Sequence, residues 1–340
     1  MRLQRVLLGI AMKKPIYLFS DGVLKRKDNT LLFITQEDRR TLPIHAVSQI
    51  HAFGEIELNK RVLELLTAHQ IPLHFYNYYG YYSGSFYPRE SLNSGLIILE
   101  QARCYLDKSE RLYLARRFVQ GALQNIQKNI AYYLKRSLPL GFVKEEITKG
   151  LEKIEEIEEI DELMALEGNV RRTYYKSFDT ILDNEDFSFE VRTKRPPQNA
   201  LNALISFGNA LLYTTALSEI YRTHLDPRIG YLHETNQRSF SLNLDLAEIF
   251  KPILVDRTIF ALVNKKMINL NHFERDVGYA YLNEQGRKIF VQAFEERLQT
   301  TIQYKNIGKV SYRRLIRLEC YKLYKHFLGE DIYQPFVARW

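Results

Sequence analysis

The sequence is poor in several residue types whose abundance would define a protein class. Its 340 residues include only two cysteines, one tryptophan, four methionines, 16 glycines and 10 prolines. Cys104 and Cys320 are too few for a disulfide-rich domain, and they share no short zinc-binding motif. We expect both to be buried, reduced thiols. With 46% hydrophobic residues and little glycine, the chain is neither a disordered tail nor a collagen-like segment.

Long apolar runs are also missing, because no stretch approaches the roughly 18 to 20 apolar residues that span a bilayer. The best candidate, residues 6–11, is far too short, although it follows two arginines as in a signal peptide. It is followed by Lys-Lys-Pro at residues 13–15 instead of a small-residue cleavage site. We therefore expect a cytoplasmic protein with no membrane contact. Met12 is an alternative start, which makes residues 1–11 an extension of undefined role.

Positive charge exceeds negative charge, and the excess is unevenly distributed. The chain carries 48 Lys and Arg against 40 Asp and Glu, a net charge of +8. Residues 145–167 hold 10 acidic and two basic residues, so the rest of the chain has a net charge of +16. A surface this basic favours a polyanionic partner, of which nucleic acid is the most common. A basic protein without such a partner is the alternative.

Short β-type segments separated by turn residues fill the first 90 residues. The expected strands are residues 16–19, 23–26, 31–34, 41–47, 48–53 and 73–76. Residues 27–30 predict a hairpin turn, and the tyrosine- and glycine-rich residues 78–87 predict a further hairpin. Apolar positions at helical spacing predict one helix up to His69, with Asn59 as its N-cap. Residues 1–90 are therefore predicted to form a small β-sandwich domain with one helix.

Helical spacing replaces this pattern after a polar segment, residues 88–94, where we place a domain boundary. The expected helical regions are residues 96–105, 109–135, 144–182, 198–223, 239–263, 284–304 and 311–328. The predicted fold class is therefore α+β. It combines the N-terminal β-sandwich of residues 1–90 with a larger, all-α C-terminal domain of residues 95–340.

Two biased segments each have a structural and a functional interpretation. The Glu pairs between isoleucines at residues 155–162 are typical of the solvated face of an amphipathic helix. Repulsion of misplaced DNA or contact with a partner is the alternative. The tyrosines of residues 78–87 could stack on bases, but they also suit a sheet face or a dimer interface. We favour the structural interpretation of both segments.

Two carboxylates and a lysine share one face of the helix expected at residues 239–263. Asp245 and Glu248 are three residues apart, and Lys251 follows three residues later. Two carboxylates in such a leucine-rich setting repel each other unless a cation lies beside them. A metal ion would satisfy this face, and an ion pair with Lys251 is the alternative.

Two further residues could join such a site. Glu167 ends the acidic segment and begins a basic, aromatic one, and Arg171 lies four residues later on the same helix face. The pair is consistent with a metal ligand beside a phosphate-binding arginine, although spacing alone does not select Glu167 from its acidic neighbours. His233 follows a helix stop and a turn at residues 225–232. Its alternative interpretation is an ordinary core or surface histidine.

Several short motifs occur in order along the chain. They are Tyr17-Leu18-Phe19-Ser20-Asp21-Gly22, Glu167 with Arg171 and Tyr174-Tyr175, Arg195-Pro196-Pro197 with Asn202, Gly230-Tyr231-Leu232-His233, and residues 244–252 with Asp256-Arg257. From Lys13 to the C-terminus the chain resembles the CRISPR-associated protein one family, the integrase and endonuclease of spacer acquisition. The C-terminal segment is similar to the branch that accompanies subtype I-B-like systems. Residues 1–11 precede the usual start of the family and inherit nothing from it.

The resemblance implies a fold, a metal and a set of site residues. It implies a C-terminal helical domain and an N-terminal β-sandwich through which two copies form a homodimer. It also implies one divalent ion, Mg²⁺ or Mn²⁺, bound by Glu167, His233 and Glu248, with Asp245 supporting this catalytic site. The third ligand of the family is Asp or Glu, so Glu248 fits the pattern. The residues expected to bind DNA are Arg171, Arg238, Lys251 and Arg257.

The activity implied by the resemblance is DNA strand transfer. The 3′-hydroxyl of a short DNA would attack a phosphodiester at the edge of a CRISPR repeat, and water would replace the hydroxyl in a hydrolytic mode. Direct transfer needs no external energy source, and the sequence contains no Walker-type ATP loop. The implied partners are DNA and a small ferredoxin-like CRISPR adaptation subunit. Two alternatives stay open, namely a general nuclease acting on branched DNA and a non-catalytic DNA-binding scaffold.

Overall fold

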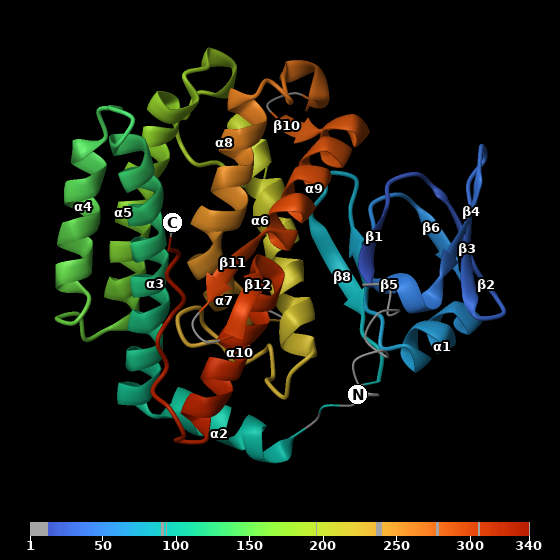
Figure 1. Ribbon diagram of the computed structural model, residues 1–340, viewed down its shortest axis with the longest axis horizontal. Coiled ribbons are helices and arrows are strands. Elements are labelled where there is room, and N and C mark those ends of the chain that lie inside the picture. Colours follow the sequence, from blue (N-terminus) through green and yellow to red (C-terminus); the bar gives the residue numbers. More distant parts are fainter. Residues whose placement is uncertain are drawn as a thin grey trace, which may run out of the picture. The chain divides into compact units, whose positions relative to one another are not determined.

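Figure 1 shows the computed structural model, which describes residues 13–89, 92, 94–194, 196–235, 240–276, 279–304 and 307–339. The chain divides into two compact units, Met1–Ser91 and Leu92–Trp340. Strands dominate the first unit and helices dominate the second. The predicted α+β fold class is confirmed. The extension expected at residues 1–11 lies outside the described residues.

Two four-stranded sheets form the first unit, with strand orders β1-β5-β7-β8 and β4-β3-β2-β6. The elements are β1 Lys14–Leu18, β2 Gly22–Lys27, β3 Thr30–Ile34, β4 Arg39–Pro43, β5 Val47–Ala52, β6 Ile56–Leu58, α1 Lys60–Ala68, β7 Leu73–Tyr76 and β8 Tyr82–Phe86. One buried apolar cluster joins both sheets to α1 and includes Leu24, Ile50, Leu66 and Leu73. Burial of these faces is what holds the sheets and the helix together.

Local sequence explains two features of this unit that were predicted. β2 and β3 form a hairpin, and Asp28 in its two-residue turn has a positive φ of 52°, which Asp tolerates better than most residues. Asn59 caps α1, because its side chain accepts a hydrogen bond from the backbone N–H of Val62 at 3.3 Å.

Two details differ from the prediction. The strand expected at residues 41–47 is β4 followed by a 3₁₀ turn at Ile44–Ala46. The hairpin expected within residues 78–87 is formed by β7 and β8, so only its second strand lies in that segment. Both segments contain a strand, as predicted, but the turns lie at other positions than the sequence indicated.

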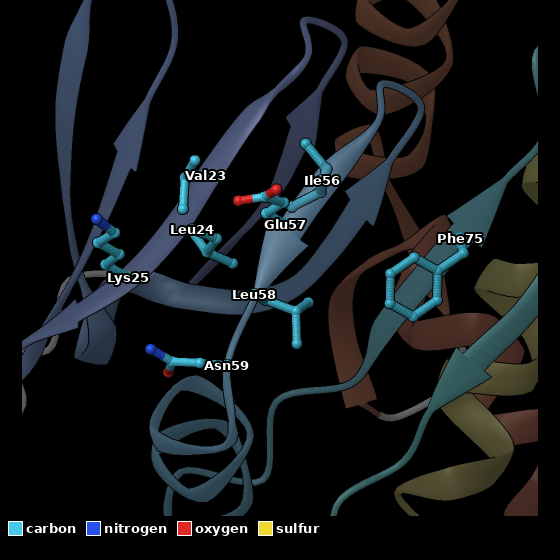
Figure 2. Close-up of a pocket in the computed structure, with 8 residues that line it drawn as sticks. All are labelled: Val23, Leu24, Lys25, Ile56, Glu57, Leu58, Asn59 and Phe75. Atoms are coloured by element: carbon cyan, nitrogen blue, oxygen red, sulfur yellow. The ribbon is translucent and has the colours of Figure 1, made fainter.

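An open hollow lies in the first unit beside β2, β6 and the start of α1 (Figure 2). Its lining residues are Val23, Leu24, Lys25, Ile56, Glu57, Leu58, Asn59 and Phe75. Most of this lining is apolar, and the single carboxylate is paired with no histidine. The predicted carboxylate and histidine residues all belong to the second unit.

The second unit is a bundle of helices with two small hairpins. Its helices are α2 Gly95–Leu106, α3 Lys108–Leu134, α4 Gly141–Lys153, α5 Ile160–Leu182, α6 Ala200–Tyr221, α7 Leu242–Lys251, α8 Arg257–Asn264, α9 Glu284–Gln299 and α10 Tyr312–Phe327. The hairpins are β9 Phe273–Asp276 with β10 Tyr279–Leu282, and β11 Thr301–Tyr304 with β12 Gly308–Ser311. The predicted helical character of this unit is confirmed. The prediction of an all-α domain was incomplete, because it contained neither hairpin. Residues 301–304, which were expected to continue a helix, form β11.

The helix predicted at residues 239–263 is interrupted in its middle. α7 ends at Lys251, and Pro252–Asp256 form a π-helical segment before α8 begins. Pro252 has no backbone N–H, so the α-helical hydrogen bond cannot form at that position. The widened turn leaves Asp256 in the core, where it is 1% exposed and forms a hydrogen bond with Tyr174 of α5.

Helix α3 runs through the centre of this unit and contacts α4, α5 and α7. Its Asn125 donates hydrogen bonds to the carbonyl oxygens of Ile249 and Phe336, both at 2.9 Å. The same side chain accepts a hydrogen bond from the backbone N–H of Ala338 at 2.9 Å. The buried side-chain amide of Asn125 therefore connects α3 both to α7 and to the C-terminal segment. In Figure 1 the C-terminal segment runs along α3.

Helix α6 is the one described helix that is long and apolar enough to cross a membrane by length and composition. We did not expect a helix of this length and apolar content from the sequence. Of its most apolar window, 89% is buried inside the protein, which is the position of a core helix. The cytoplasmic location expected from the sequence stays a prediction.

Candidate active site

Glu167 and Glu248 approach each other from two helices that are far apart in the sequence. Glu167 lies in the first half of α5, and Glu248 lies in α7. Arg171, one turn after Glu167, bridges them. Its Nε donates a hydrogen bond to Glu167 Oε1, and its Nη2 donates one to Glu248 Oε2 at 2.6 Å. The spacing of four residues places Glu167 and Arg171 on one face of α5, as predicted.

Glu248 is a buried carboxylate held between two cations. Its side chain is 6% exposed, and its Oε1 accepts a hydrogen bond from Lys251 Nζ. Burial raises the pKa of Glu248, but Lys251 and Arg171 lower it by more, so the pKa lies below its ordinary value. Burial lowers the pKa of Lys251 and Arg171, yet their carboxylate neighbours raise both above their ordinary values. All three groups are therefore ionised at neutral pH.

Asp245, one turn before Glu248, holds the loop that precedes α7. It is fully buried. Its Oδ2 accepts hydrogen bonds from the backbone N–H of Tyr231 at 2.6 Å and of Leu232 at 3.2 Å. Its Oδ1 accepts one from the backbone N–H of His233 at 2.9 Å. A single carboxylate thus satisfies three consecutive backbone donors, which fixes the path of the loop.

The same carboxylate orients the ring of His233, because Asp245 Oδ1 lies 2.8 Å from His233 Nδ1. With Nδ1–H donated to Asp245, Nε2 is left as the acceptor, which is the arrangement found in metal-binding histidines. Burial lowers the pKa of His233, but the hydrogen bond and charge of Asp245 raise it by more, so the pKa lies above its ordinary value. Glu248 and Lys251 also shift this pKa, in opposite directions, so the ring lies beside their end of the site.

The donor set fits a divalent cation in its chemistry. Two carboxylates and an imidazole are ligands that Mg²⁺ and Mn²⁺ accept. The guanidinium of Arg171 now supplies the positive charge between Glu167 and Glu248, and its Nη1 is buried without a hydrogen-bond partner. The donor atoms of Glu167, His233 and Glu248 do not all lie within 4.8 Å of one another. Binding of one ion by all three therefore requires these side chains to move closer together.

The cations predicted to bind DNA differ in their surroundings. Arg171 and Lys251 are 9% and 6% exposed, and both are engaged with Glu248. They lie in the interior of the site and not on its outer surface. The guanidinium of Arg257 lies over the Tyr132 ring, 5.2 Å from its centroid. Arg238 lies outside the described residues.

Lys194 is a cation at this site that sequence reasoning did not select. It is an exposed residue of the loop before α6. Partial desolvation lowers its pKa, as do the charges of Arg192 and Lys251, whereas Glu248 and Glu167 raise it. Its electrostatic neighbours are therefore the residues of the candidate site. The Arg-Pro-Pro motif that follows it directly in the sequence is the signal that could have identified it.

Asp256 is a buried carboxyl group next to the site. Burial raises its pKa to about 7, and Arg171, Tyr174 and Lys251 only partly oppose this effect. Its Oδ2 has no hydrogen-bond partner. The group is therefore a neutral acid below pH 7, and its ionisation above that pH is unfavourable because the charge would be incompletely solvated.

We predict that Asp245→Ala lowers the free energy of unfolding by about 2–4 kcal/mol, because it leaves three buried backbone N–H groups without their acceptor. Hydrogen exchange measured by mass spectrometry should show faster exchange at residues 231–233. Glu162→Gln, a change at an exposed position of α5, serves as the control and should leave both quantities nearly unchanged. Undiminished protection at residues 231–233 in Asp245→Ala would show that the carboxylate does not hold the loop.

We predict that Asp256 makes the protein less stable as the pH rises from 5 to 7. An unfolded Asp releases its proton near pH 3.9, whereas folded Asp256 keeps it up to about pH 7. Between these values the folded state binds more protons, so the free energy of unfolding falls by up to about 1.4 kcal/mol per pH unit. Asp256→Asn removes this dependence. Urea denaturation of both proteins across the range should therefore give curves that diverge with pH, and parallel curves would contradict the assignment.

Comparison with known proteins identifies the family. Residues 16–296 match the family described as CRISPR associated protein Cas1. A CRISPR-associated endonuclease Cas1 of Thermodesulfovibrio yellowstonii is 57% identical over 330 residues, which cover 97% of this chain and 100% of that relative. A CRISPR-associated endonuclease Cas1 of Thermotoga maritima is 48% identical over 321 residues, covering 94% and 98%.

Solved structures agree with this result. A CAS1 protein from Thermotoga maritima superposes with a TM-score of 0.86 at 47% identity, covering 96% of this chain and 100% of that one. A casposase bound to an integration product has a TM-score of 0.84 at 21% identity, covering 96% and 93%, and this likeness concerns the fold alone. The family that the sequence motifs indicated is confirmed: the chain belongs to the Cas1 family of CRISPR-associated proteins.

Proposed function

We propose that this protein is a metal-dependent DNA endonuclease and integrase of CRISPR spacer acquisition. The observation that carries the proposal is the convergence of Glu167 and Glu248 on one positive charge, next to a histidine whose ring is oriented by Asp245. Its relatives are named endonucleases, which supports a nucleolytic activity. The net charge of +8 supports a polyanionic substrate.

Glu167, His233 and Glu248 are the proposed ligands of one Mg²⁺ or Mn²⁺ ion. When bound, such an ion lowers the pKa of an attacking oxygen and offsets negative charge on a phosphoryl group. Oxygen ligands with one imidazole suit these hard ions better than a thiolate would. Arg171 donates hydrogen bonds to both of the carboxylate ligands.

Three neighbouring side chains prepare these ligands. Asp245 holds the His233 ring with Nε2 as the acceptor. Lys251 and Arg171 keep Glu248 ionised although it is buried. Because the cluster is largely shielded from water, the charges interact more strongly than they would on the surface. Glu248 is therefore held in the ionised state that a divalent ion requires, whereas protonated His233 must release its Nε2 proton when the ion binds.

The proposed reaction exchanges one phosphodiester bond for another. The 3′-hydroxyl oxygen of a short DNA attacks a phosphorus atom at the edge of a CRISPR repeat. A new P–O bond forms as the P–O bond to the repeat's own 3′ oxygen breaks; the attacking hydroxyl loses a proton, and the leaving oxygen gains one. If water attacks instead, the same step is hydrolysis.

The proposed partners are DNA, a second copy of the chain bound through the β-strand unit, and a small ferredoxin-like adaptation subunit. A Cas6-RT-Cas1–Cas2 complex contains a chain of this fold, with a TM-score of 0.84 at 18% identity over 97% of this chain and 36% of that one. That complex supports the proposal of a further CRISPR-associated subunit.

We predict that Glu167→Gln, His233→Ala and Glu248→Gln each reduce strand transfer by at least about 100-fold, since each removes a ligand. The test is the joining of a labelled short duplex to a repeat-containing plasmid, with Mg²⁺ or Mn²⁺ and with and without the adaptation subunit. Any neutral residue at this position leaves Arg171 and Lys251 buried without their anion, at a cost of about 3–5 kcal/mol. Glu248→Gln is preferred to Glu248→Ala, because the amide oxygen still accepts a hydrogen bond from one of them. The assay also separates an integrase from a general nuclease, which would cleave the plasmid without joining the duplex.

Glu162→Gln, at an exposed position in the first turn of α5, is the matched control and should leave strand transfer unchanged. All variants are first compared by thermal unfolding. Wild-type rates in a folded Glu167→Gln or His233→Ala protein would remove that residue from the ligand set.

We predict that Lys194→Ala weakens binding of short duplex DNA and reduces the slope of log affinity against log salt by about one unit, the loss of one phosphate contact. Lys194 suits this test better than Arg171 or Lys251, because Lys194 is exposed whereas the other two residues are buried. Lys149→Ala, at an exposed position of α4, is the control. Equal salt slopes for wild type and Lys194→Ala in a fluorescence anisotropy titration would exclude this contact.

A further inference from the structure

A second cluster of potential metal ligands lies away from the candidate active site. It consists of Cys104 near the end of α2, Glu110 in the first turn of α3, and His326 in the last turn of α10. One donor atom from each lies within 4.8 Å of the other two. Within the described ranges of the chain, no other set of three His, Cys, Asp or Glu donors meets this limit. We expected Cys104 to be simply a buried, reduced thiol, because its neighbours in the cluster are not its neighbours in the sequence.

The local structure holds two of these residues in a fixed relation. Asp107 separates α2 from α3 and caps α3, accepting hydrogen bonds from the backbone N–H groups of Ser109 at 2.9 Å and Glu110 at 3.1 Å. The sharp corner brings the end of α2 and the start of α3 together. α10 also contacts α2 (Figure 1), and this contact adds the histidine.

His326 contributes a largely buried imidazole to the cluster. Its side chain is 10% exposed, and its Nε2 lies 3.3 Å from Glu110 Oε2. The alignment of this contact is poor for a hydrogen bond, but Glu110 still interacts with the ring and raises its pKa. Burial lowers the pKa of His326 by more than Glu110 raises it, so the imidazole is neutral at pH 7. An imidazole nitrogen close to both a carboxylate oxygen and a sulfur is an arrangement in which histidine binds metals.

Cys104 supplies a buried sulfur to the same place. It is 1% exposed, and Arg103 Nη2 lies 3.4 Å from its Sγ. Burial raises the pKa of the thiol to about 11, although Arg103 opposes this effect. Without a metal the group is therefore a thiol, and metal binding must displace its proton.

We propose that Cys104, Glu110 and His326 form a zinc-binding site. Thiolate, imidazole and carboxylate together are ligands of Zn²⁺ and not of Mg²⁺ or Ca²⁺. In a tetrahedral site with bonds of about 2.0–2.3 Å, ligand atoms are about 3.3–3.8 Å apart. The 3.3 Å between His326 Nε2 and Glu110 Oε2 already has this value, and the sulfur lies within 4.8 Å of both. The three protein ligands leave a fourth position for water.

Such an ion would tie α10 to the corner between α2 and α3. These elements come from the beginning and the end of the second unit, so the ion would join distant parts of the chain. It shares no residue with the site of Glu167, His233 and Glu248. The proposed role is therefore structural, and it stands independently of the proposed catalytic function.

Binding has two chemical consequences. The Cys104 thiol releases one proton to solvent as the Zn–S bond forms, while Glu110 and His326 bind without net loss of a proton. The backbone N–H of Tyr333 now donates a long hydrogen bond, 3.4 Å, to His326 Nδ1. With zinc on Nε2, the ring proton moves to Nδ1 and this hydrogen bond is lost.

The test uses Co²⁺ as a spectroscopic substitute for Zn²⁺ in the full-length, metal-stripped and reduced protein. Wild type should develop a thiolate-to-Co²⁺ charge-transfer band in the near ultraviolet that saturates at one equivalent and disappears when Zn²⁺ is added. The active site has no sulfur ligand and cannot produce this band. Excess Zn²⁺ should also raise the melting temperature by about 5 °C.

Matched variants complete the experiment. Cys320→Ser is the control, because Cys320 is also a buried cysteine and lies outside the cluster, and it should keep the band. Cys104→Ser should lose the band. Glu110→Gln, at a side chain that is 39% exposed and tolerates the change, should weaken Co²⁺ binding at least 10-fold even if Cys104→Ser fails to fold. Absence of the band in wild type, its persistence in Cys104→Ser, or unchanged affinity in Glu110→Gln would overturn the proposal.

Discussion

A buried row of alternating charges holds the candidate active site together. Glu167, Arg171, Glu248 and Lys251 follow one another through direct hydrogen bonds, two from α5 and two from α7. None of them could be buried alone, because an isolated ion in a protein interior costs several kcal/mol. Each charge therefore depends on its neighbours, and the row couples the positions of two helices that are distant in the sequence. A metal ion that binds both carboxylates would take over the role of the Arg171 guanidinium, which already lies between Glu167 and Glu248.

Asp245 extends this dependence from the helices to the loop. Because it accepts hydrogen bonds from three consecutive backbone N–H groups and from the ring of His233, the loop and the imidazole are positioned by the same carboxylate. Asp245 thereby acts on a proposed ligand without being one itself. The π-helical segment that follows α7 adds Asp256, a buried acid whose raised pKa makes its ionisation sensitive to the surrounding charges. The site thus combines groups that must be charged with one that is stable only when neutral.

The two proposed metal sites of the second unit differ in the chemistry of their donors. The site between α5 and α7 has oxygen ligands and one imidazole, which suit a hard ion with open coordination positions for substrate oxygens. The cluster at α2, α3 and α10 contains a thiolate, which selects a softer ion. Different donor sets would keep the two ions apart by ligand preference. In this member of the Cas1 family, the ion between α5 and α7 would take part in the reaction, whereas the ion at α2, α3 and α10 would stabilise the fold.

The sequence by itself determined the features that depend on near neighbours. The hairpin turn at Asp28, the Asn59 cap and the shared face of Asp245, Glu248 and Lys251 follow from local propensity and the helical repeat of 3.6 residues. Family resemblance, and not spacing, singled out Glu167 and His233. Only the tertiary structure decided that Arg171 reaches across to Glu248, that Asp245 serves the loop, and that Cys104 meets a histidine from the other end of the unit. The physical reason is that local periodicity decides which side chains share a face, whereas burial of the whole core decides which faces meet.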